Sequence, residues 1–379
     1  MKGLIKKGKY FGLGFLLYFS YSAASQNPMP KRAYWHLAGT ISSGVKVKMN
    51  LVKVNDSVYA DCILSSMGNS ASPLQNEQNN PCDFCGKIDA RGNIILHRFG
   101  SEFPVFRGQM NGDGKIRGDF EEETGKDKPG FELDELNEAG SVQFNVFSLF
   151  KSVPLTGKSK RPNGSISMVF LSPLESRDAM ISDSLRKSMA AFFNSSAYRG
   201  SDPDSILAGN YLTFRRDYVS NNQDLYRQYP DSPIMNWELL KYMHLICNEK
   251  YWLSFYILDY AYTGGAHGLE TREYQTIDLK TGKIISLDDI LIEGKKQVLT
   301  TLLTARLRSA NHIPVSQKLT EAGFFVDEIK PNDNFYLIPE GLGFFYNHYD
   351  IAPYASGPTE IFLNMGEIRE LLKPGVLRF

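Results

Sequence analysis

The chain has 379 residues, which is enough for two or three domains with a substantial core. Charged residues make up 22% and aromatic residues 12%, a composition too apolar for an intrinsically disordered chain. Lysine plus arginine and aspartate plus glutamate both count 42, so no basic excess points to nucleic-acid binding.

The first 25 residues have the pattern of a secretory signal peptide. Lysines at four of the first nine positions precede an apolar stretch over residues 10–19, and small residues at 22–25 offer a cleavage site. The apolar stretch is shorter than the roughly 20 residues that cross a bilayer. We therefore expect a cleaved signal peptide and a secreted or periplasmic protein, with no membrane span in the mature chain and no lipid-anchor cysteine.

Residues 30–150 are expected to form a β-rich domain. Val45, Val47 and Met49 alternate with polar residues, which predicts a strand with one buried and one wet face. The Asn-Gly-Asp-Gly stretch over 111–114 is typical of a hairpin turn. Six or seven short strands at this spacing suggest a meander that curls into a small barrel or sandwich.

After residue 150 the sequence pattern changes from one typical of β structure alone to one that predicts both helices and strands. Residues 151–165 are rich in proline, glycine and basic residues, which predicts a linker. Residues 166–234 predict a small α+β subdomain with two helices, and residues 235–379 a domain whose hairpins span 239–262 and 335–346. The expected fold class is α+β: an N-terminal all-β, barrel-like domain, then a helical pair and a mostly antiparallel sheet.

The four cysteines are Cys62, Cys82, Cys85 and Cys247. Export permits disulfides, and Cys82 and Cys85 have redox-motif spacing. They follow an Asn/Gln-rich stretch, which indicates a loop. Three interpretations stay open: structural thiols that are free or locally bridged, a disulfide involving Cys62, and redox catalysis. A zinc site would need a second close pair, and we expect no metal and no other cofactor.

The stretch Tyr-Thr-Gly-Gly-Ala-His-Gly over residues 262–268 is the most informative feature for function. Gly264 and Gly265 allow a positive φ or a close approach to a ligand. His267 adds a titratable, hydrogen-bonding group to the same bend. The structural alternative is that the imidazole binds neighbouring backbone and locks the bend. Tyr262, at the start of the bend, offers a ring for stacking or for core packing.

A second loop, over residues 352–358, combines Pro353 with Tyr354. Proline and tyrosine lose little entropy on docking, which favours recognition surfaces. The structural alternative is a turn in which Tyr354 is buried.

Four stretches occur in a specific order, over residues 260–268, 277–289, 335–342 and 350–358. In this order they resemble the RsiV-type extracytoplasmic domain of unknown function, which is also found beside the catalytic domain of some peptidoglycan deacetylases. The resemblance covers about residues 163–379. It implies an α+β envelope domain that binds more than it catalyses, because in the RsiV receptor this domain binds lysozyme.

These observations lead to one leading hypothesis and two rivals. The chain is expected to be an exported, non-enzymatic envelope protein that recognises a lysozyme-like protein or a peptidoglycan fragment through loops 263–268 and 352–358. The expected binding residues are Tyr262, Gly264, Gly265, His267, Pro353 and Tyr354. One rival is an envelope polysaccharide hydrolase or deacetylase, or an accessory module of one, in which Asp259 orients His267; the other is a purely structural surface protein. The leading hypothesis requires the two loops to converge.

Overall fold

The computed structural model describes residues 29–66, 81–111, 114–121, 127–156, 162–174, 179–194 and 202–376. The expected signal peptide lies outside the described residues. Within the described part of the chain, no helix is both long and apolar enough to cross a membrane.

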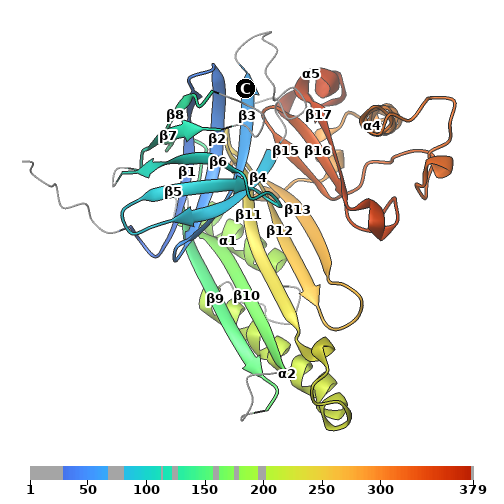
Figure 1. Ribbon diagram of the computed structural model, residues 1–379. Coiled ribbons are helices and arrows are strands. Elements are labelled where there is room, and N and C mark those ends of the chain that lie inside the picture. Colours follow the sequence, from blue (N-terminus) through green and yellow to red (C-terminus); the bar gives the residue numbers. More distant parts are fainter. Residues whose placement is uncertain are drawn as a thin grey trace, which may run out of the picture.

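The N-terminal region is a closed barrel of eight antiparallel strands, coloured blue to teal in Figure 1. Its apolar residues alternate along each strand, so that every second side chain, such as Val47 and Met49, packs inside the barrel. β1 pairs with β8 and closes the wall, which leaves no open edge. The strands are β1 (Arg32–Ile41), β2 (Val45–Val54), β3 (Ser57–Ser66), β4 (Pro81–Ile88), β5 (Asn93–Arg98), β6 (Pro104–Met110), β7 (Ile116–Phe120) and β8 (Gly130–Glu135).

A six-stranded sheet follows, in the order β14-β13-β12-β11-β10-β9. β10 runs parallel to β11, and the other neighbours are antiparallel. The strands are β9 (Phe144–Pro154), β10 (Asn163–Pro173), β11 (Glu238–Glu249), β12 (Trp252–Tyr262), β13 (Leu269–Asp278) and β14 (Lys283–Ile284).

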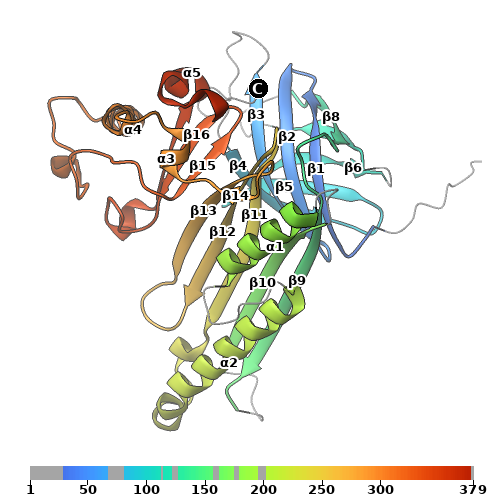
Figure 2. The same cartoon turned by 180° about the vertical axis from the view of Figure 1, so that it is seen from behind.

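The two faces of this sheet have different coverings. Helices α1 (Ala179–Phe193) and α2 (Pro203–Gln228) lie across one face, as Figure 2 shows. On that face, here called the helix face, Leu253, Phe255 and Ile257 join one apolar core with residues of both helices. The opposite face, here called the barrel face, carries the alternate residues of β12, including Tyr256 and Leu258.

The C-terminal region packs against part of the barrel face. Its three-stranded sheet consists of β15 (Phe335–Ile338), β16 (Gly341–Tyr346) and β17 (Thr359–Asn364), with helices α3 (Leu287–Ile290), α4 (Lys296–Ala310) and α5 (Met365–Ile368) nearby (Figures 1 and 2). The Ser254 hydroxyl donates to the Leu337 carbonyl oxygen at 2.6 Å, and the Leu337 amide donates to Thr276 Oγ1 at 3.3 Å. These buried bonds fix β15 against β12 and β13.

The barrel packs on the same face beside that small sheet. Asp61 on β3 accepts from His244 Nδ1 at 3.0 Å and from the Tyr256 hydroxyl at 3.2 Å. The Lys48 ammonium binds Glu249 at 2.6 Å and Glu340 at 3.0 Å, which joins the barrel, the central sheet and the β15–β16 turn. Charged and hydrogen-bonded groups therefore set how the barrel is seated.

The α+β fold class and the N-terminal barrel are confirmed, while two local predictions are wrong. The stretch 151–165 is not a linker at its two ends, because β9 continues into it as far as Pro154 and β10 begins in it at Asn163, and these two strands pair with each other. The Cys82–Cys85 stretch lies in β4 rather than in a loop. Cys85 and Cys247 carry free thiols.

Candidate functional site

The loop between β12 and β13 carries the glycine-rich bend. Gly264 and Gly265 have φ of +91° and +122°, values that residues with a Cβ rarely adopt. Gly268 is needed for a different reason, because a Cβ there would lie 2.4 Å from the Tyr260 ring. The Tyr262 hydroxyl donates to the Gly265 carbonyl oxygen at 3.3 Å. The bend is thus a defined turn that presents His267 to solvent.

The second loop presents Tyr354 through a single short turn. Pro353 is exposed and caps this 3₁₀ turn over Tyr354–Ser356, and Gly357 ends it with φ of +74°. The Tyr354 ring is half-buried. Its hydroxyl donates to the Gly268 carbonyl oxygen at 2.9 Å, so it reaches into the first loop.

The structure brings the two loops together. The His267 and Tyr354 rings are stacked, with centroids 3.8 Å apart and planes at 19°. His348 stacks on Tyr354 as well, at 4.3 Å and 21°. Residues more than 80 positions apart in sequence therefore build one arrangement, here called the aromatic stack, of His267, Tyr354 and His348.

Hydrogen bonding fixes the orientation of one member of the stack. His267 Nδ1 lies 2.9 Å from the Gly268 carbonyl oxygen, and because a carbonyl only accepts, Nδ1 carries the proton. In the neutral ring Nε2 is then an acceptor. The structural interpretation of His267 is thus realised, since its imidazole does bind neighbouring backbone, while the ring itself remains exposed.

Sequence reasoning missed one residue of this surface, His348, which stacks on Tyr354. Tyr349 also lies here, with its ring centroid 5.8 Å from that of Tyr354. Tyr349 has φ of +71° and is 55% exposed. The signal that could have found His348 is its place six residues ahead of Tyr354, just after strand β16, which ends at Tyr346.

Asp259 does not orient His267. Its carboxylate accepts from the Lys241 ammonium at 2.9 Å. Asp259 alternates with Leu258 and Tyr260 along β12, so it belongs to the helix face, where Lys241 also lies over the Phe193 ring. The histidine–carboxylate pair that the enzymatic rival requires is therefore absent from this bend. Among the described residues, no three His, Cys, Asp or Glu side chains gather in a way that could hold a metal ion.

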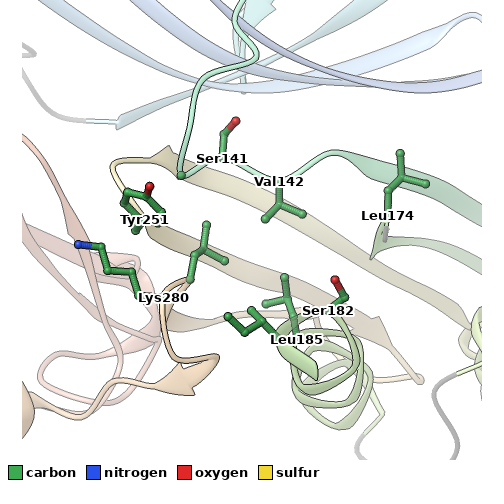
Figure 3. A pocket seen from close by; sticks show the side chains of 10 residues that line it. Ser141, Val142, Leu174, Ser182, Leu185, Tyr251 and Lys280 are labelled. Atoms are coloured by element: carbon green, nitrogen blue, oxygen red, sulfur yellow. The ribbon is translucent and has the colours of Figure 1, made fainter. Parts of the chain in front are cut away.

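A separate pocket of about 510 Å³ lies between the entry to β9, α1 and the β13–β14 turn. Figure 3 shows Val142, Leu174 and Leu185 around this space. Lys280 lies to one side, with its ammonium 4.7 Å from the Tyr251 ring centroid. None of the residues predicted for the site lines this pocket.

Two family models match the chain. Residues 176–270 match the model described as "Deacetylase PdaC", and residues 288–365 match a "Protein of unknown function (DUF3298)". The barrel lies ahead of both stretches. One loop of the candidate site falls in each of them, so the aromatic stack joins the two matched parts. Comparison with curated proteins gives no match.

Two solved structures are similar to the chain. A DUF3298 protein from Bacteroides fragilis is 26% identical with a TM-score of 0.58, over 63% of this chain and 96% of its own. A DUF3298 protein from Pseudomonas aeruginosa is 16% identical with a TM-score of 0.43, over 62% of this chain and 96% of its own. The matches support an extracytoplasmic-type domain of unknown function beside a deacetylase-like domain, and they suggest an envelope-associated protein.

Proposed function

We propose that this chain is an exported, non-catalytic binding protein of the cell envelope, which recognises a lysozyme-like protein or a wall glycan. The recognition surface consists of the loops over 263–268 and 348–358. Tyr262, His267 and Tyr354 are its central residues, and Pro353 forms its rim.

The observation that carries this proposal is the aromatic stack. Tyr354 is held between His267 and His348 while one side of the group stays open to solvent. Rings that are already ordered lose little further entropy on binding, so their contact area contributes to affinity with a small ordering cost. The hydrogen bonds of the Tyr262 hydroxyl to the Gly265 carbonyl oxygen and of the Tyr354 hydroxyl to the Gly268 carbonyl oxygen hold the loop in shape before a partner arrives.

The test is a calorimetric titration of the mature chain with lysozyme and, separately, with soluble peptidoglycan fragments. We expect one of the two to bind. Tyr354→Ala should weaken that binding by at least tenfold, as truncation of a central aromatic residue at an interface commonly does. Tyr354→Phe keeps the stack and loses the bond to the Gly268 carbonyl, so its effect should be smaller.

The matched control is Tyr229→Ala, because Tyr229 is an exposed tyrosine at the end of α2. It should leave the affinity unchanged. If the wild-type chain binds neither lysozyme nor peptidoglycan fragments, the proposal is wrong; equal losses in the Tyr229 and Tyr354 variants would show that the binding surface lies elsewhere.

A further inference from the structure

A cleft of about 410 Å³ lies where the barrel meets the barrel face of the six-stranded sheet. The barrel supplies one wall, from β3, β4 and the segment after β5, and strands β11, β12 and β13 supply the other. Pockets at such junctions between packed units are common places for ligands. The lining residues are Tyr59, Asp83, Phe84, Cys85, Phe99, Glu238, Leu240, Tyr242, His244, Leu258, Tyr260 and Glu270.

The strand register explains why these side chains converge. Leu240 pairs with Tyr260, and Tyr260 pairs with Glu270, so the three form a row across β11, β12 and β13. Cross-strand partners project to the same side of a sheet. On the barrel, Tyr59 of β3 pairs with Cys85 of β4, and both project outward because their neighbours Val58 and Ala60 fill the barrel interior.

The walls of the cleft are largely aromatic. Tyr59 lies against Tyr242 with ring centroids 5.7 Å apart. Tyr260 is partly exposed beside them, and Phe99 is 60% exposed on the barrel side. These rings present faces that can stack on an apolar group or attract a cation.

The charge of the cleft is negative. Asp83, Glu238 and Glu270 line it, and the lining contains no lysine or arginine among the described residues. Two cations lie beside the cleft: the Arg272 guanidinium binds Asp83 at 2.6 Å and Glu270 at 3.1 Å, and the Arg98 guanidinium lies over the Phe84 ring, 5.6 Å from its centroid. The Arg272 guanidinium therefore pairs with two carboxylates, which leaves an excess of negative charge for a bound cation.

Other groups do not cancel this charge. Lys241, on the strand that carries Glu238, lies on the helix face and binds Asp259. His244 is bound to Asp61. Burial and, after it, the negative charge of the neighbouring Glu238 raise the pKa of the Tyr260 hydroxyl.

We propose that this cleft is a binding site for an organic cation, an alkylammonium or guanidinium group on an apolar stem. The stem lies against the tyrosine and phenylalanine rings, and the charged end faces Glu238 and the shared carboxylates. Aromatic rings together with a carboxylate are a combination that favours such cations over neutral molecules of the same shape. This site is distinct from the aromatic stack and does not rest on the function proposed for it.

The test compares two probes of nearly equal shape. N-acetyl-lysine methylamide carries the ammonium, and N-acetyl-norleucine methylamide has the same stem without the charge. NMR titration of the tyrosine ring signals should show the lysine derivative binding and the norleucine derivative binding at least fivefold more weakly. Cadaverine, a free amine, forms a third arm. Tighter binding of cadaverine than of the lysine derivative would identify a free amine as the preferred ligand, and tighter binding of the lysine derivative would identify a lysine side chain.

Two variants locate the binding, each with a matched control. Glu238→Gln removes an exposed carboxylate and should weaken binding of the lysine derivative about two- to fivefold. Phe99→Leu removes a ring face and should weaken it to a similar extent, about two- to fivefold. Glu273→Gln, on β13 but on the opposite face, and Phe150→Leu, an exposed ring on β9, should change nothing.

A chemical readout is independent of affinity. The half-buried Cys85 thiol lines the cleft, so a bound ligand should slow its alkylation, with the buried Cys247 thiol as internal reference. Three results would each overturn the proposal. The norleucine derivative could bind as tightly as the lysine derivative, N-acetylglucosamine could protect Cys85 where the lysine derivative does not, or no probe could protect Cys85 at all. Tyr354→Ala should leave cleft binding intact, so failure of this site and failure of the aromatic stack are distinguishable.

Discussion

The two faces of the six-stranded sheet are held in different ways. On the helix face, Leu253, Phe255 and Ile257 meet α1 and α2 in an apolar core. On the barrel face, the contacts to the barrel include the buried hydrogen bond between His244 Nδ1 and Asp61 and the ion pair of Arg272 with Asp83. Apolar burial is strong but non-directional, whereas paired charges add little net stability and demand one geometry. The helices therefore stabilise the sheet through apolar burial, and the contacts with the barrel supply the relative placement that the candidate sites depend on.

The largest effect should come from the helix face. Phe255 is fully buried and packs edge-on against Phe192 at 5.5 Å. Phe255→Ala should lower the free energy of unfolding by about 4 kcal/mol, because it removes apolar contacts and leaves a cavity. Urea denaturation followed by circular dichroism measures this. A loss smaller than that of Arg272→Met would reverse the assignment of roles to the two faces.

Arg272→Met tests the barrel face. The Arg272 side chain is 13% exposed and holds Asp83 and Glu270. Its loss leaves two carboxylates facing each other without their cation, at a cost of about 3 kcal/mol. The distinguishing readout is limited proteolysis, because the barrel should become separable while the helix face stays folded. Unchanged protease sensitivity would show that the ion pair does not seat the barrel.

Stability should also depend on pH through Asp61. Burial raises the pKa of the Asp61 carboxyl from 3.8 to about 6, although His244 opposes that shift. The native state thus holds this proton more tightly than the unfolded chain, so its stability falls as pH rises from about 4 to about 6. The change is about 2 kcal/mol. Urea midpoints across this range should slope downward for the wild type and slope less in Asp61→Asn, where the remaining slope comes from groups such as Glu360, whose pKa burial raises to about 7.

The smallest effect is expected at Lys48. Its side chain is 30% exposed and bridges Glu249 and Glu340, and these two carboxylates raise the pKa of the ammonium against the opposing effect of burial. Lys48→Met should cost about 1 kcal/mol, because solvent reaches the pair and the methionine keeps the apolar stem contacts. Thermal unfolding of the wild type and of Lys48→Met measures this loss of stability. A loss above that of Arg272→Met would make Lys48 the main attachment of the barrel.

Much of the fold follows from sequence patterns. Alternating apolar residues on β2 predicted the barrel wall, and Val47 and Met49 do fill its interior. The same alternation assigned Asn50 to a wet face, yet Asn50 is buried and binds His36 and the Ile246 carbonyl. Periodicity within one strand gives its two sides but does not say what covers the outer one. The predicted linker failed for a related reason, since proline and glycine mark a hairpin turn as readily as a boundary.

The candidate site was predictable where its chemistry is local. The glycines of the 263–268 bend and the ring of Tyr354 were visible as motifs, and their convergence was expected. His348 was missed because it forms no motif with another histidine, and its place six residues ahead of Tyr354 was the one signal that the sequence offered. The cleft between the barrel and the six-stranded sheet could not be found from sequence at all, because Tyr59, Asp83 and Phe99 meet Glu238 only through the packing of the barrel on the sheet.

The parallel pairing of β10 with β11 limits how the protein can be divided. A shortened chain that starts at residue 176, where the family matches begin, would keep β11 and β12 but lose β10, the parallel neighbour of β11, together with β9. The edge of β11 that pairs with β10 would then be open, and an open strand edge can pair with other chains. A soluble fragment for dissecting the recognition loops must therefore begin ahead of Phe144, which precedes both stretches that the family models match.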